Sequence, residues 1–527
     1  MAENSAQPLI ESLQDPALYD HPVQGFTVLE THISWVILTG DYAYKIKKPV
    51  NFGFLDFSTL ALRRKYCLEE VRLNARYAAD LYLAVVGIYG DYRTPSLQGN
   101  GEPMEYAVKM RQFPQDALLS RLLERSRLLE IHIDAMAKEV AAFHAIAQHA
   151  APDNPWGTPE QVQEWALENF AEIRPLLQDS KSLRQLDALH AWTEKEYQRR
   201  RDQLQARKRE GGIRECHGDL HLGNMFLQGE RIRLFDCIEF NEELRWIDVM
   251  CEAAFVVMDL CDRGRPEFAW RFLNRYLQHT GDYTSLAILP YYFVYRALVR
   301  AKVSLLRLSQ GHLDENERTA VLQEFRGYLN LAQGMSQRPV PAVIITHGLS
   351  GSGKSVTAGK LAETLLAVHV RSDIERKRLY GYGMTADSGS SLHSGIYSTT
   401  ATVRTYDRLA EIAAAALDGG DTVLVDATFL ESGQRRRFLD QARRTGAAAV
   451  ILDFQIPEQM LRERIMARQR SGGDVSEAGL DILASQLRQV QPLSTEERRF
   501  VVVIDRDTET DVQWLKTEIQ RRIQDQH

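Results

Sequence analysis

The most constraining feature of the sequence is a stretch of eight residues, 348–355, that reads Gly-Leu-Ser-Gly-Ser-Gly-Lys-Ser. It matches the pattern G-x-x-x-x-G-K-[ST] at every position. An apolar strand is predicted directly before it, at 342–346, and a helix directly after it, at 356–366. In that context glycines let the backbone wrap around a phosphate, so that successive N–H groups and the helix N-terminus face the anion. We therefore expect an α/β domain whose first strand leads into a phosphate-binding loop.

The same motif assigns roles to its individual residues. Lys354 is expected to bridge the β- and γ-phosphates of a nucleotide, and the Ser355 hydroxyl to ligate Mg²⁺. The implied ligand is ATP with magnesium. The residues expected to contact this ligand are Gly348, Ser350, Gly351, Ser352, Gly353, Lys354 and Ser355.

Two carboxylates and an arginine favour a kinase over a molecular switch or motor. The run Val-Leu-Val-Asp ends a predicted buried strand with Asp426, which suits a ligand near the magnesium ion. Asp373 follows another predicted strand, and a carboxylate there can take the proton of an acceptor hydroxyl. Arg376 can hold a phosphate or another anion of the acceptor.

An arginine-rich segment precedes Ser-Gly-Gly near residue 470. Arg464 and Arg468 are four residues apart and therefore share one face of a predicted helix. A solvated helix is the simpler reading of such a charge run. Next to a glycine hinge in a phosphate-loop protein, we favour a lid that closes on the γ-phosphate.

These residues together resemble the zeta-toxin and polynucleotide-kinase-like group of P-loop kinases, over about residues 341–510. The resemblance includes the phosphate loop, the Asp373-x-x-Arg376 pair, Asp426 and the arginine lid. The group phosphorylates hydroxyls on nucleotide sugars, gluconate-like sugars and nucleic-acid 5′ ends. The resemblance thus implies kinase chemistry and leaves the acceptor open.

The first half of the chain carries a second constellation. Residues 217–224 read His-Gly-Asp-Leu-His-Leu-Gly-Asn, which is H-x-D followed five residues later by Asn. Twelve residues further on, an apolar segment ends in Asp236. Phosphoryl transfer on the protein-kinase-like fold needs an aspartate to orient the acceptor hydroxyl, and an asparagine and an aspartate to hold the metal. Asp219, Asn224 and Asp236 satisfy these needs in the right order.

A small lobe should then supply a lysine for the nucleotide phosphates and a helix glutamate to orient it. Lys45 and Lys47 share one face of a predicted strand, so alternation cannot choose between them. The A-x-K spacing favours Lys45. On the next helix Glu70 flanks an apolar stripe and is the expected partner, with Glu69 as the alternative.

This half resembles the aminoglycoside phosphotransferase family, small-molecule relatives of protein kinases, over about residues 25–335. The resemblance implies that Asp248 braces the catalytic loop. We expect His217 to be a structural pivot and the more exposed His221 not to contact substrate. One departure from the kinase pattern is that residues 30–35 contain no G-x-G-x-x-G loop to cover the phosphates.

The predicted elements suggest two domains with different folds. A β meander is predicted at 27–48, a helix from about Ser58 to Ala79, a β pair at 83–90 and 105–112, and mainly helices from 116 to 333, interrupted by a strand-like segment at 213–236. The fold class is a mixed α/β and α+β multidomain protein, in which a bilobal protein-kinase-like fold precedes a P-loop NTPase fold with a parallel sheet flanked by helices. The predicted domains are 1–337, with a small lobe at about 25–115 and a large lobe at about 116–337, and 338–527.

Composition narrows the class of partner. The net charge of −7 gives no global attraction for nucleic acid or anionic membranes, although a local basic patch could still bind nucleic acid in the C-terminal half. No run of 18 apolar residues predicts a membrane helix. The N-terminus is polar and acidic, unlike a signal peptide. Five scattered cysteines without a C-x-x-C pair argue against disulfides and fit a cytoplasmic location. The oligomeric state is left open.

The leading functional hypothesis is a bifunctional, ATP-dependent phosphotransferase. Each half would transfer the γ-phosphate of MgATP to a hydroxyl of a small molecule, such as a sugar, a nucleotide sugar or an aminoglycoside-like compound. One alternative makes the C-terminal half a nucleic-acid 5′-hydroxyl kinase. Another makes the N-terminal half a ligand sensor that gates the P-loop half.

Overall fold

The computed structural model of the protein describes residues 3–526, except for 54, 152, 310–313, 385, 387–394, 472–478 and 506–510. Contacts divide the chain into two compact units. The first comprises residues 1–135, 142–157 and 208–256, and the second 136–141, 158–207 and 257–527. The predicted domain boundary near residue 338 falls inside the second unit. The boundary near residue 338 therefore marks a change of fold within one compact unit.

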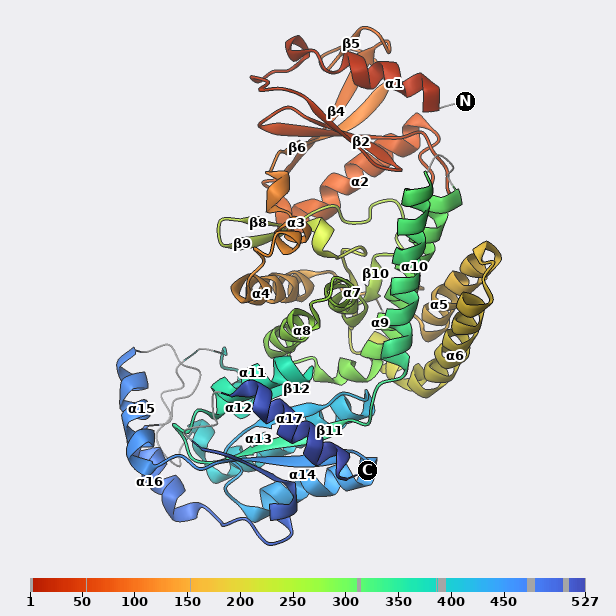
Figure 1. The fold of residues 1–527 in the computed structure, drawn as a ribbon. Coiled ribbons are helices and arrows are strands. Elements are labelled where there is room, and N and C mark those ends of the chain that lie inside the picture. Colours follow the sequence, from red (N-terminus) through yellow and green to blue (C-terminus); the bar gives the residue numbers. More distant parts are fainter. Residues whose placement is uncertain are drawn as a thin grey trace. The chain divides into compact units, whose positions relative to one another are not determined.

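The first unit contains a six-stranded antiparallel sheet (Figure 1). Its strands are β1 (Thr27–Glu30), β2 (Ser34–Leu38), β3 (Tyr42–Lys47), β4 (Tyr82–Gly90), β5 (Pro95–Ser96) and β6 (Glu105–Arg111). They lie in the order β1-β2-β3-β6-β4-β5, and every neighbouring pair is antiparallel. The predicted meander and the predicted β pair are both confirmed.

The two faces of β3 differ in character because side chains alternate along a strand. Tyr44 and Ile46 are buried in a cluster with residues of α1 (Glu3–Ser12). Lys45 and Lys47 point to the other face, where both contact α2 (Leu60–Ala78). The helix begins one residue later than predicted: Thr59, rather than Ser58, caps it by accepting a hydrogen bond from a backbone N–H.

The remainder of the first unit consists of short strands and helices around a loop. β7 (Ile213–Glu215) pairs with β10 (Trp246–Asp248), and β8 (Met225–Gln228) pairs with β9 (Arg231–Leu234), both antiparallel. The predicted strand-like segment at 213–236 is thus confirmed. α3 (Leu119–Glu124) lies in this unit, while α4 (Glu130–Ile146) and α7 (Val249–Asp262) contribute residues to both units.

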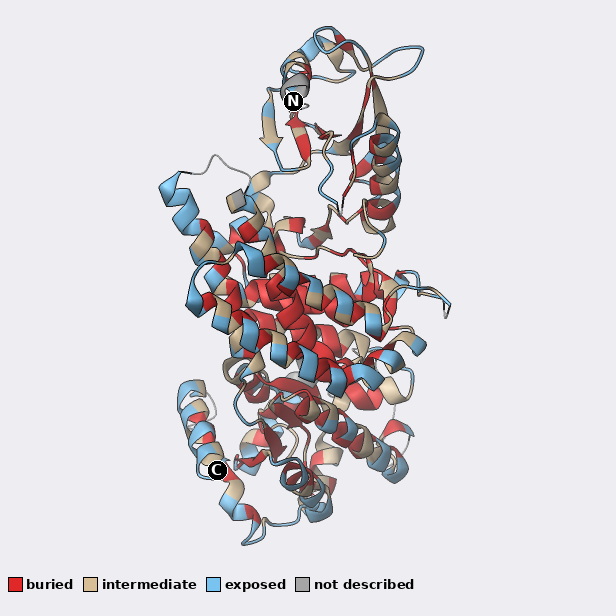
Figure 2. Ribbon diagram, turned by 90° about the vertical axis from the view of Figure 1, so that its right-hand side faces the viewer, coloured by how far each residue is buried: buried red, intermediate tan, exposed pale blue. Residues whose placement is uncertain are grey.

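The second unit begins with helices. They are α5 (Pro159–Ile173), α6 (Ser180–Arg209), α8 (Pro266–Thr280), α9 (Leu289–Ser309) and α10 (Glu315–Ser336). α9 packs against α5 and α10 and is buried at every position from 291 to 298. α6 instead alternates buried and exposed positions, the pattern of an amphipathic helix, and such two-sided helices are visible in Figure 2.

A five-stranded parallel sheet follows in the same unit (Figure 1). Its strands are β11 (Ala342–His347), β12 (Val368–Arg371), β13 (Val423–Asp426), β14 (Ala448–Phe454) and β15 (Val501–Ile504). The order is β12-β13-β11-β14-β15, so β11 is central and β12 is an edge strand. β11, β13 and β14 are buried throughout, as expected for strands covered on both faces.

Helices cover both faces of this sheet. α11 (Lys354–Leu365) and α17 (Val512–Gln524) lie on one face, and α13 (Thr399–Asp418) and α14 (Ser432–Thr445) lie on the other. α12 (Ser372–Leu379) follows the edge strand β12, and α15 (Glu458–Ser471) and α16 (Leu480–Gln489) contact each other. α11 and α17 share one apolar cluster with Ala342 and Ile344 of β11. Val343 and Ile345 point to the opposite face, where α13 and α14 pack. The predicted P-loop fold with a parallel sheet is confirmed.

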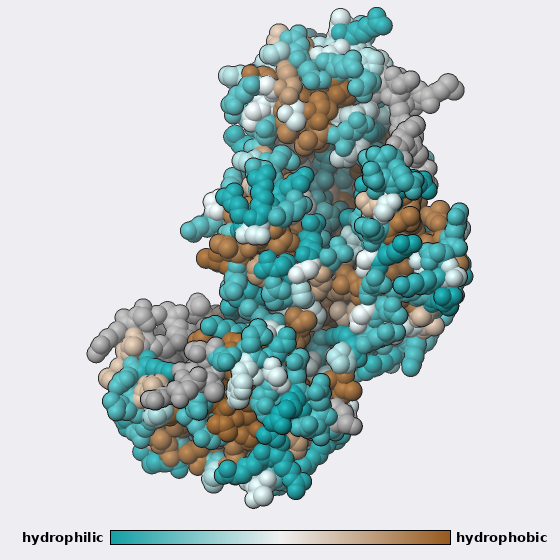
Figure 3. All heavy atoms as spheres, viewed as in Figure 1, coloured by the Kyte–Doolittle hydropathy of each residue, from teal (hydrophilic) through white to brown (hydrophobic). Residues whose placement is uncertain are grey.

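Among the described residues, no helix is both long and apolar enough to cross a membrane. Hydrophilic residues predominate on the face of the molecule drawn in Figure 3, and hydrophobic residues form separate patches there.

Candidate active sites

The phosphate loop joins the end of β11 to the start of α11. Gly348, Gly351 and Gly353 all have positive φ angles, of 147°, 84° and 87°, which glycine adopts without strain. A Cβ atom at Gly351 would lie 2.9 Å from the Leu461 carbonyl oxygen. α11 begins at Lys354, two residues earlier than predicted, so the N-terminus of the helix adjoins the loop. The loop therefore has the backbone conformation that phosphate binding requires.

Lys354 lies back across this loop. Its Nζ donates to the Leu349 carbonyl at 2.6 Å and to Ser352 Oγ at 3.3 Å. The side chain is largely buried, so its charge is held by loop oxygens rather than by water.

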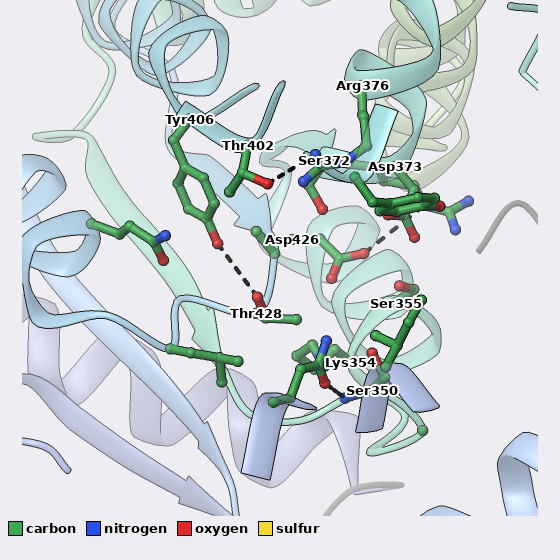
Figure 4. Close-up of a pocket in the computed structure, with 18 of the residues that line it drawn as sticks. Ser350, Lys354, Ser355, Ser372, Asp373, Arg376, Thr402, Tyr406, Asp426 and Thr428 are labelled. Atoms are coloured by element: carbon green, nitrogen blue, oxygen red, sulfur yellow. Dashed lines mark hydrogen bonds and ion pairs between the residues drawn. The ribbon is translucent and has the colours of Figure 1, made fainter. Parts of the chain in front are cut away.

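A cavity of about 440 Å³ opens beside the loop. Most of the residues predicted for this site line it, and several are labelled in Figure 4. They are Ser350, Gly351, Gly353, Lys354, Ser355, Asp373, Arg376, Asp426 and Arg464. Gly348 and Ser352 belong to the same loop but do not line the cavity. Residues predicted from four separate segments thus meet at one place.

Asp426 is the most buried carboxylate of this cavity, at the carboxyl end of β13. Its Oδ2 lies 3.7 Å from His369 Nε2 and 3.9 Å from Arg371 Nε. Burial raises the pKa of Asp426, but His369, Arg371 and the Ser355 hydroxyl together lower it below its ordinary value. The carboxyl group is therefore ionised, and with Ser355 it offers the oxygen ligands that Mg²⁺ prefers.

Asp373 and Arg376 lie on α12, which starts directly after β12. The guanidinium of Arg376 donates to the Ile396 carbonyl at 2.9 Å and to Thr402 Oγ1 at 3.3 Å, and it lies over the Tyr397 ring. Its Nε is buried and makes no hydrogen bond to any described residue. One nitrogen of the Arg376 guanidinium thus binds residues of the cavity wall. The predicted role of Arg376 in binding an anion of the acceptor stays a prediction.

The arginine helix is α15, and its two predicted residues differ in what can be said of them. Arg464 lines the cavity. The backbone of Arg468 belongs to α15, but its side chain falls outside the described part of the chain. The lid function of both arginines stays a prediction.

Two contacts of the loop with α15 and α16 were not foreseen. Gln486 Oε1 accepts a hydrogen bond from the Ser350 backbone N–H at 2.8 Å. Leu349 packs against an apolar cluster formed by Ile456, Leu461, Ile465 and Leu483. No sequence motif predicts the contact of Gln486 with the loop. The apolar residue Leu349 within the loop does indicate that apolar side chains pack against it.

The second candidate site lies in the first unit, where charged side chains pair across β3 and α2. Glu70 binds Lys45 Nζ at 2.9 Å through one oxygen and Lys47 Nζ at 2.7 Å through the other. Lys45 also pairs with Asp236, and Lys47 pairs with Glu239. Only Lys45 therefore connects the helix glutamate to the predicted metal ligand.

Burial and charge act in opposite directions in this network. Burial raises the pKa of Glu70, but Lys45 and Lys47 together lower it to about 2. Burial lowers the pKa of Lys45, but Asp236 and Glu70 raise it well above its ordinary value. Glu70 and Lys45 are thus both charged near neutral pH. Glu69, the predicted alternative, binds Arg72 and Arg245 and no lysine.

The loop that carries Asp219 and Asn224 is held together by its own hydrogen bonds. Asn224 Nδ2 donates to the Asp219 carbonyl at 2.9 Å and to Asp219 Oδ2 at 3.2 Å. The Asn224 carbonyl in turn accepts from Phe235 N–H at 3.1 Å, which brings Asp236 next to the loop. Asp236 has a φ of 65°, a conformation that costs a non-glycine residue about 1–3 kcal/mol and is typical of functional sites.

The two histidines of this loop lie in different surroundings. His217 is fully buried, its Nε2–H donates to the Phe235 carbonyl, 2.7 Å away, and burial lowers its pKa. This suits the predicted structural pivot. His221 is half-buried rather than exposed, and its Nε2 is 3.5 Å from Asp219 Oδ2. It is therefore closer to the predicted catalytic carboxylate than expected.

Buried residues that sequence reasoning missed brace the same loop. Glu252 accepts from Gly218 N–H at 2.6 Å and from His144 Nε2 at 2.8 Å. Asp248, predicted to be structural, accepts from Met250 N–H at 2.8 Å at the start of α7. In place of a glycine-rich phosphate cover, β1 and β2 are joined by a tight turn in which Ser34 N–H donates to Thr31 Oγ1.

Comparisons with known proteins agree with this division of chemistry. A family model described as "phosphotransferase enzyme family" matches residues 67–289, and one described as "AAA domain" matches residues 343–493. An uncharacterized protein of Mycobacterium tuberculosis is 32% identical over 468 residues, which cover 88% of this chain and 91% of the relative. An uncharacterized protein of Mycobacterium bovis matches to the same extent.

Solved kinase structures also resemble parts of the chain. A sugar kinase from Janibacter is 20% identical, with a TM-score of 0.27, and the match covers 35% of this chain and 95% of that one. An amicoumacin kinase in complex with AMP-PNP and Ca²⁺ is 15% identical, with a TM-score of 0.37, over 61% of this chain and 93% of that one. Both TM-scores are below 0.5, so neither similarity supports a conclusion here.

The matched families and the two sites define an ATP-dependent phosphotransferase that combines a phosphotransferase-family domain with a P-loop kinase-like domain. Within that class, the chain belongs to the family of the mycobacterial proteins, with which it shares sequence across both domains.

Proposed function

We propose that both kinase-like domains transfer the γ-phosphate of MgATP to a hydroxyl group of a small molecule, which makes the chain bifunctional. For the P-loop domain, the observation that carries the proposal is that one cavity is lined by Lys354, Ser355, Asp373 and Asp426. These residues supply what phosphoryl transfer to a hydroxyl requires: a cation for the phosphates, oxygen ligands for magnesium, and a carboxylate for the hydroxyl proton.

In the P-loop site each residue has a distinct task. The amides at the start of α11 and the Lys354 ammonium hold the β- and γ-phosphates, and Asp373 accepts the proton of the attacking hydroxyl. Ser355 and the ionised Asp426 would hold Mg²⁺, which neutralises charge on the β- and γ-oxygens when bound. Arg464 stabilises the negative charge of the transferred group from the side of α15.

In the other site, side chains take the place of the backbone cradle. Lys45, oriented by Glu70, binds the nucleotide phosphates, and Asp219 orients the acceptor hydroxyl. Asn224 and Asp236 would hold the magnesium ion. Because Lys45 pairs with Asp236 in this structure, the ammonium must move from that carboxylate to the phosphates when MgATP binds.

The acceptor side of the P-loop cavity supports a small, hydroxyl-rich acceptor. Neutral hydrogen-bonding side chains line it: Tyr397, Thr399, Thr402, Tyr406, Thr428 and Gln434. Charged groups of both signs line the cavity as well: Asp373, Asp426 and Glu431 are acidic, and Lys354, Arg371, Arg376 and Arg464 are basic. Such a lining suits a sugar, a nucleotide sugar or an aminoglycoside-like compound better than a polyanion.

The alternative for this domain is a nucleic-acid 5′-hydroxyl kinase. It is disfavoured by the net charge of −7 and by the three acidic side chains, Asp373, Asp426 and Glu431, that line the cavity. Filter binding of single-stranded RNA and DNA across a salt titration tests it. A steep decrease of affinity with salt would support the nucleic-acid kinase and contradict the small-molecule proposal for this site.

The alternative for the N-terminal domain is a ligand sensor that gates the P-loop domain. The ion pair between Lys45 and Asp236 and the hydrogen bond between Asn224 and Asp219 support an enzyme instead, because a sensor needs neither contact. We place the protein in the cytoplasm, where ATP is present and where its five free cysteines would stay reduced.

A screen of a metabolite library with γ-labelled ATP tests the proposal. The intact chain is compared with Asp219→Ala and Lys354→Ala. Each labelled product should disappear in one variant and persist in the other, which assigns it to a domain. If all products depend on Lys354 and none on Asp219, the N-terminal domain is not an enzyme for these acceptors and the sensor reading replaces bifunctionality.

A further inference from the structure

The helix α8 belongs by sequence to the phosphotransferase match but packs on the sheet of the P-loop domain. Its residues, Pro266–Thr280, lie inside the segment 67–289 that matches the phosphotransferase family. Yet α8 packs against β12 and α11 of the parallel sheet, within the same compact unit (Figure 1). β12 is an edge strand, and an edge strand leaves backbone N–H and C=O groups without a partner strand.

Asn274 of α8 forms hydrogen bonds with two backbone groups at that strand edge. Its Nδ2 donates to the Ala367 carbonyl at 3.0 Å, and its Oδ1 accepts from His369 N–H at 2.8 Å. The side chain is buried, so these bonds do not compete with water. An asparagine amide offers a donor and an acceptor side by side, as a neighbouring strand would. Asn274 therefore fixes the backbone of β12 four residues before Asp373.

The far end of α12 is held by the same helix. Arg378 Nη2 donates to the Gln278 carbonyl at 2.5 Å, and Nη1 to the His279 carbonyl at 3.5 Å. Both carbonyls belong to the last turn of α8, where the helix dipole favours a cation. The contact is close: a Cβ atom at Gly281, the C-cap of α8, would lie 2.7 Å from the Arg378 guanidinium.

The buried carboxylate of Glu375 pairs with the arginines that connect α12 and α13 to the end of α8. Glu375 is fully buried and lies 3.1 Å from Arg378 Nε and 3.6 Å from Arg408 Nε. Arg408 in turn donates to the Gly281 carbonyl at 3.2 Å. α8 thus holds β12 before Asp373 and α12 after it, while the phosphate loop itself is not among these contacts.

We infer that α8 supports the acceptor site of the P-loop domain from outside the cavity, and that Asn274 and Arg378 are positioning residues that hold Asp373 at the cavity. The inference rests on the proposed function, in which Asp373 takes the proton of the acceptor. Its physical basis is that catalysis depends on placement: a shift of about 1 Å in a reacting group can cost about a hundredfold in rate. Nucleotide binding, which depends on the loop, should not change.

The experiment uses the full chain with Asp219→Ala, so that turnover reports on the P-loop site. Hydrolysis of MgATP, with water in place of the acceptor, is measured for Asn274→Ala, Arg378→Ala and Asp373→Asn, and AMP-PNP affinity is measured by calorimetry. Asp373→Asn should lower kcat by about 10²–10⁴-fold. Asn274→Ala and Arg378→Ala should lower it by about ten- to a hundredfold, with AMP-PNP affinity within about twofold of the parent.

Three further variants make the result specific. Arg378→Lys should recover part of the rate, because a cation remains at the end of α8. Arg271→Gln removes an ion pair of α8 with Glu363 of α11 and should leave kcat unchanged, since that pair does not touch β12 or α12. Asn274→Ala combined with Asp373→Asn should be no slower than Asp373→Asn alone, because both act on one group.

The outcomes separate the two claims. If Asp373→Asn hydrolyses ATP at the parent rate, the proposed role of Asp373 fails. If Asp373→Asn is slow but Asn274→Ala and Arg378→Ala are as fast as the parent, the inference about α8 is wrong while the proposed function stands. A loss of AMP-PNP affinity in proportion to kcat, or additive effects in the double variant, would also overturn it.

Discussion

The two candidate sites solve the same problem with different materials. In the proposed P-loop site, eight consecutive residues and the helix N-terminus that follows them would form the phosphate cradle, mainly through backbone N–H groups. In the kinase-like site, Lys45 meets Glu70 and Asp236, which are 25 and 191 positions away along the chain. A contiguous loop is set by local backbone geometry, whereas the dispersed site depends on the packing of a whole sheet and helix. Changes to the backbone should therefore disrupt the P-loop site most, and loss of ion pairs should disrupt the kinase-like site most.

The largest effect is expected from Lys47→Met, which leaves Glu70 and Glu239 without their shared partner. Breaking a buried ion pair on one side costs about 3–5 kcal/mol. We expect the free energy of unfolding of the first unit to decrease by about that amount, measured by urea titration with hydrogen exchange in β3 and α2. Lys65→Met, at an exposed position of α2, is the matched control. An unfolding curve equal to that of the control would show that the network is not structural.

A backbone change at the loop should have an intermediate effect. Gly351→Ala places a side chain at a φ of 84° and 2.9 Å from the Leu461 carbonyl. Such strain costs about 1–3 kcal/mol, which corresponds to about 5- to 150-fold weaker binding of AMP-PNP. Gly433→Ala, with open space around its Cβ position, should bind normally. Normal binding by Gly351→Ala as well would mean that the loop is more adaptable than its geometry implies.

The smallest effect is expected from Gln486→Ala, which removes one side-chain contact from the backbone cradle. The Ser350 N–H then loses a neutral hydrogen bond, worth about 0.5–1.5 kcal/mol. MgATP turnover by the P-loop site should change by no more than about tenfold, with Arg488→Ala on the exposed side of α16 as the control. A much larger loss would show that the P-loop site also depends on a distant side chain, and the contrast between the two sites would weaken.

The sequence predicted the parts that are encoded locally. The spacing of residues 348–355 predicted the loop and its flanking strand and helix, and the spacing from Asp219 to Asn224 predicted residues that do touch. Alternation along β3 could not separate Lys45 from Lys47, because both face α2. The A-x-K spacing favoured Lys45, and the ion pair between Lys45 and Asp236 agrees with that choice.

Contacts made by single side chains across the fold could not be predicted. Asn274 and Gln486 each bind a backbone group more than 90 positions away, and neither lies in a motif. The helix cap was misplaced by one residue because Ser58 and Thr59 are both good N-caps. Such choices depend on tertiary packing, which a periodic pattern does not record.

The edge position of β12 has a consequence for how this protein can be divided. A fragment cut at the linker near residue 338 would lose α8, and the outer side of the strand would be open to solvent. Exposed strand edges recruit strands from other molecules, so such a fragment should aggregate through β12 even if its sheet forms. The family matches at 67–289 and 343–493 therefore do not mark where the chain can be cut, because α8 belongs to the first match and packs on β12 of the second.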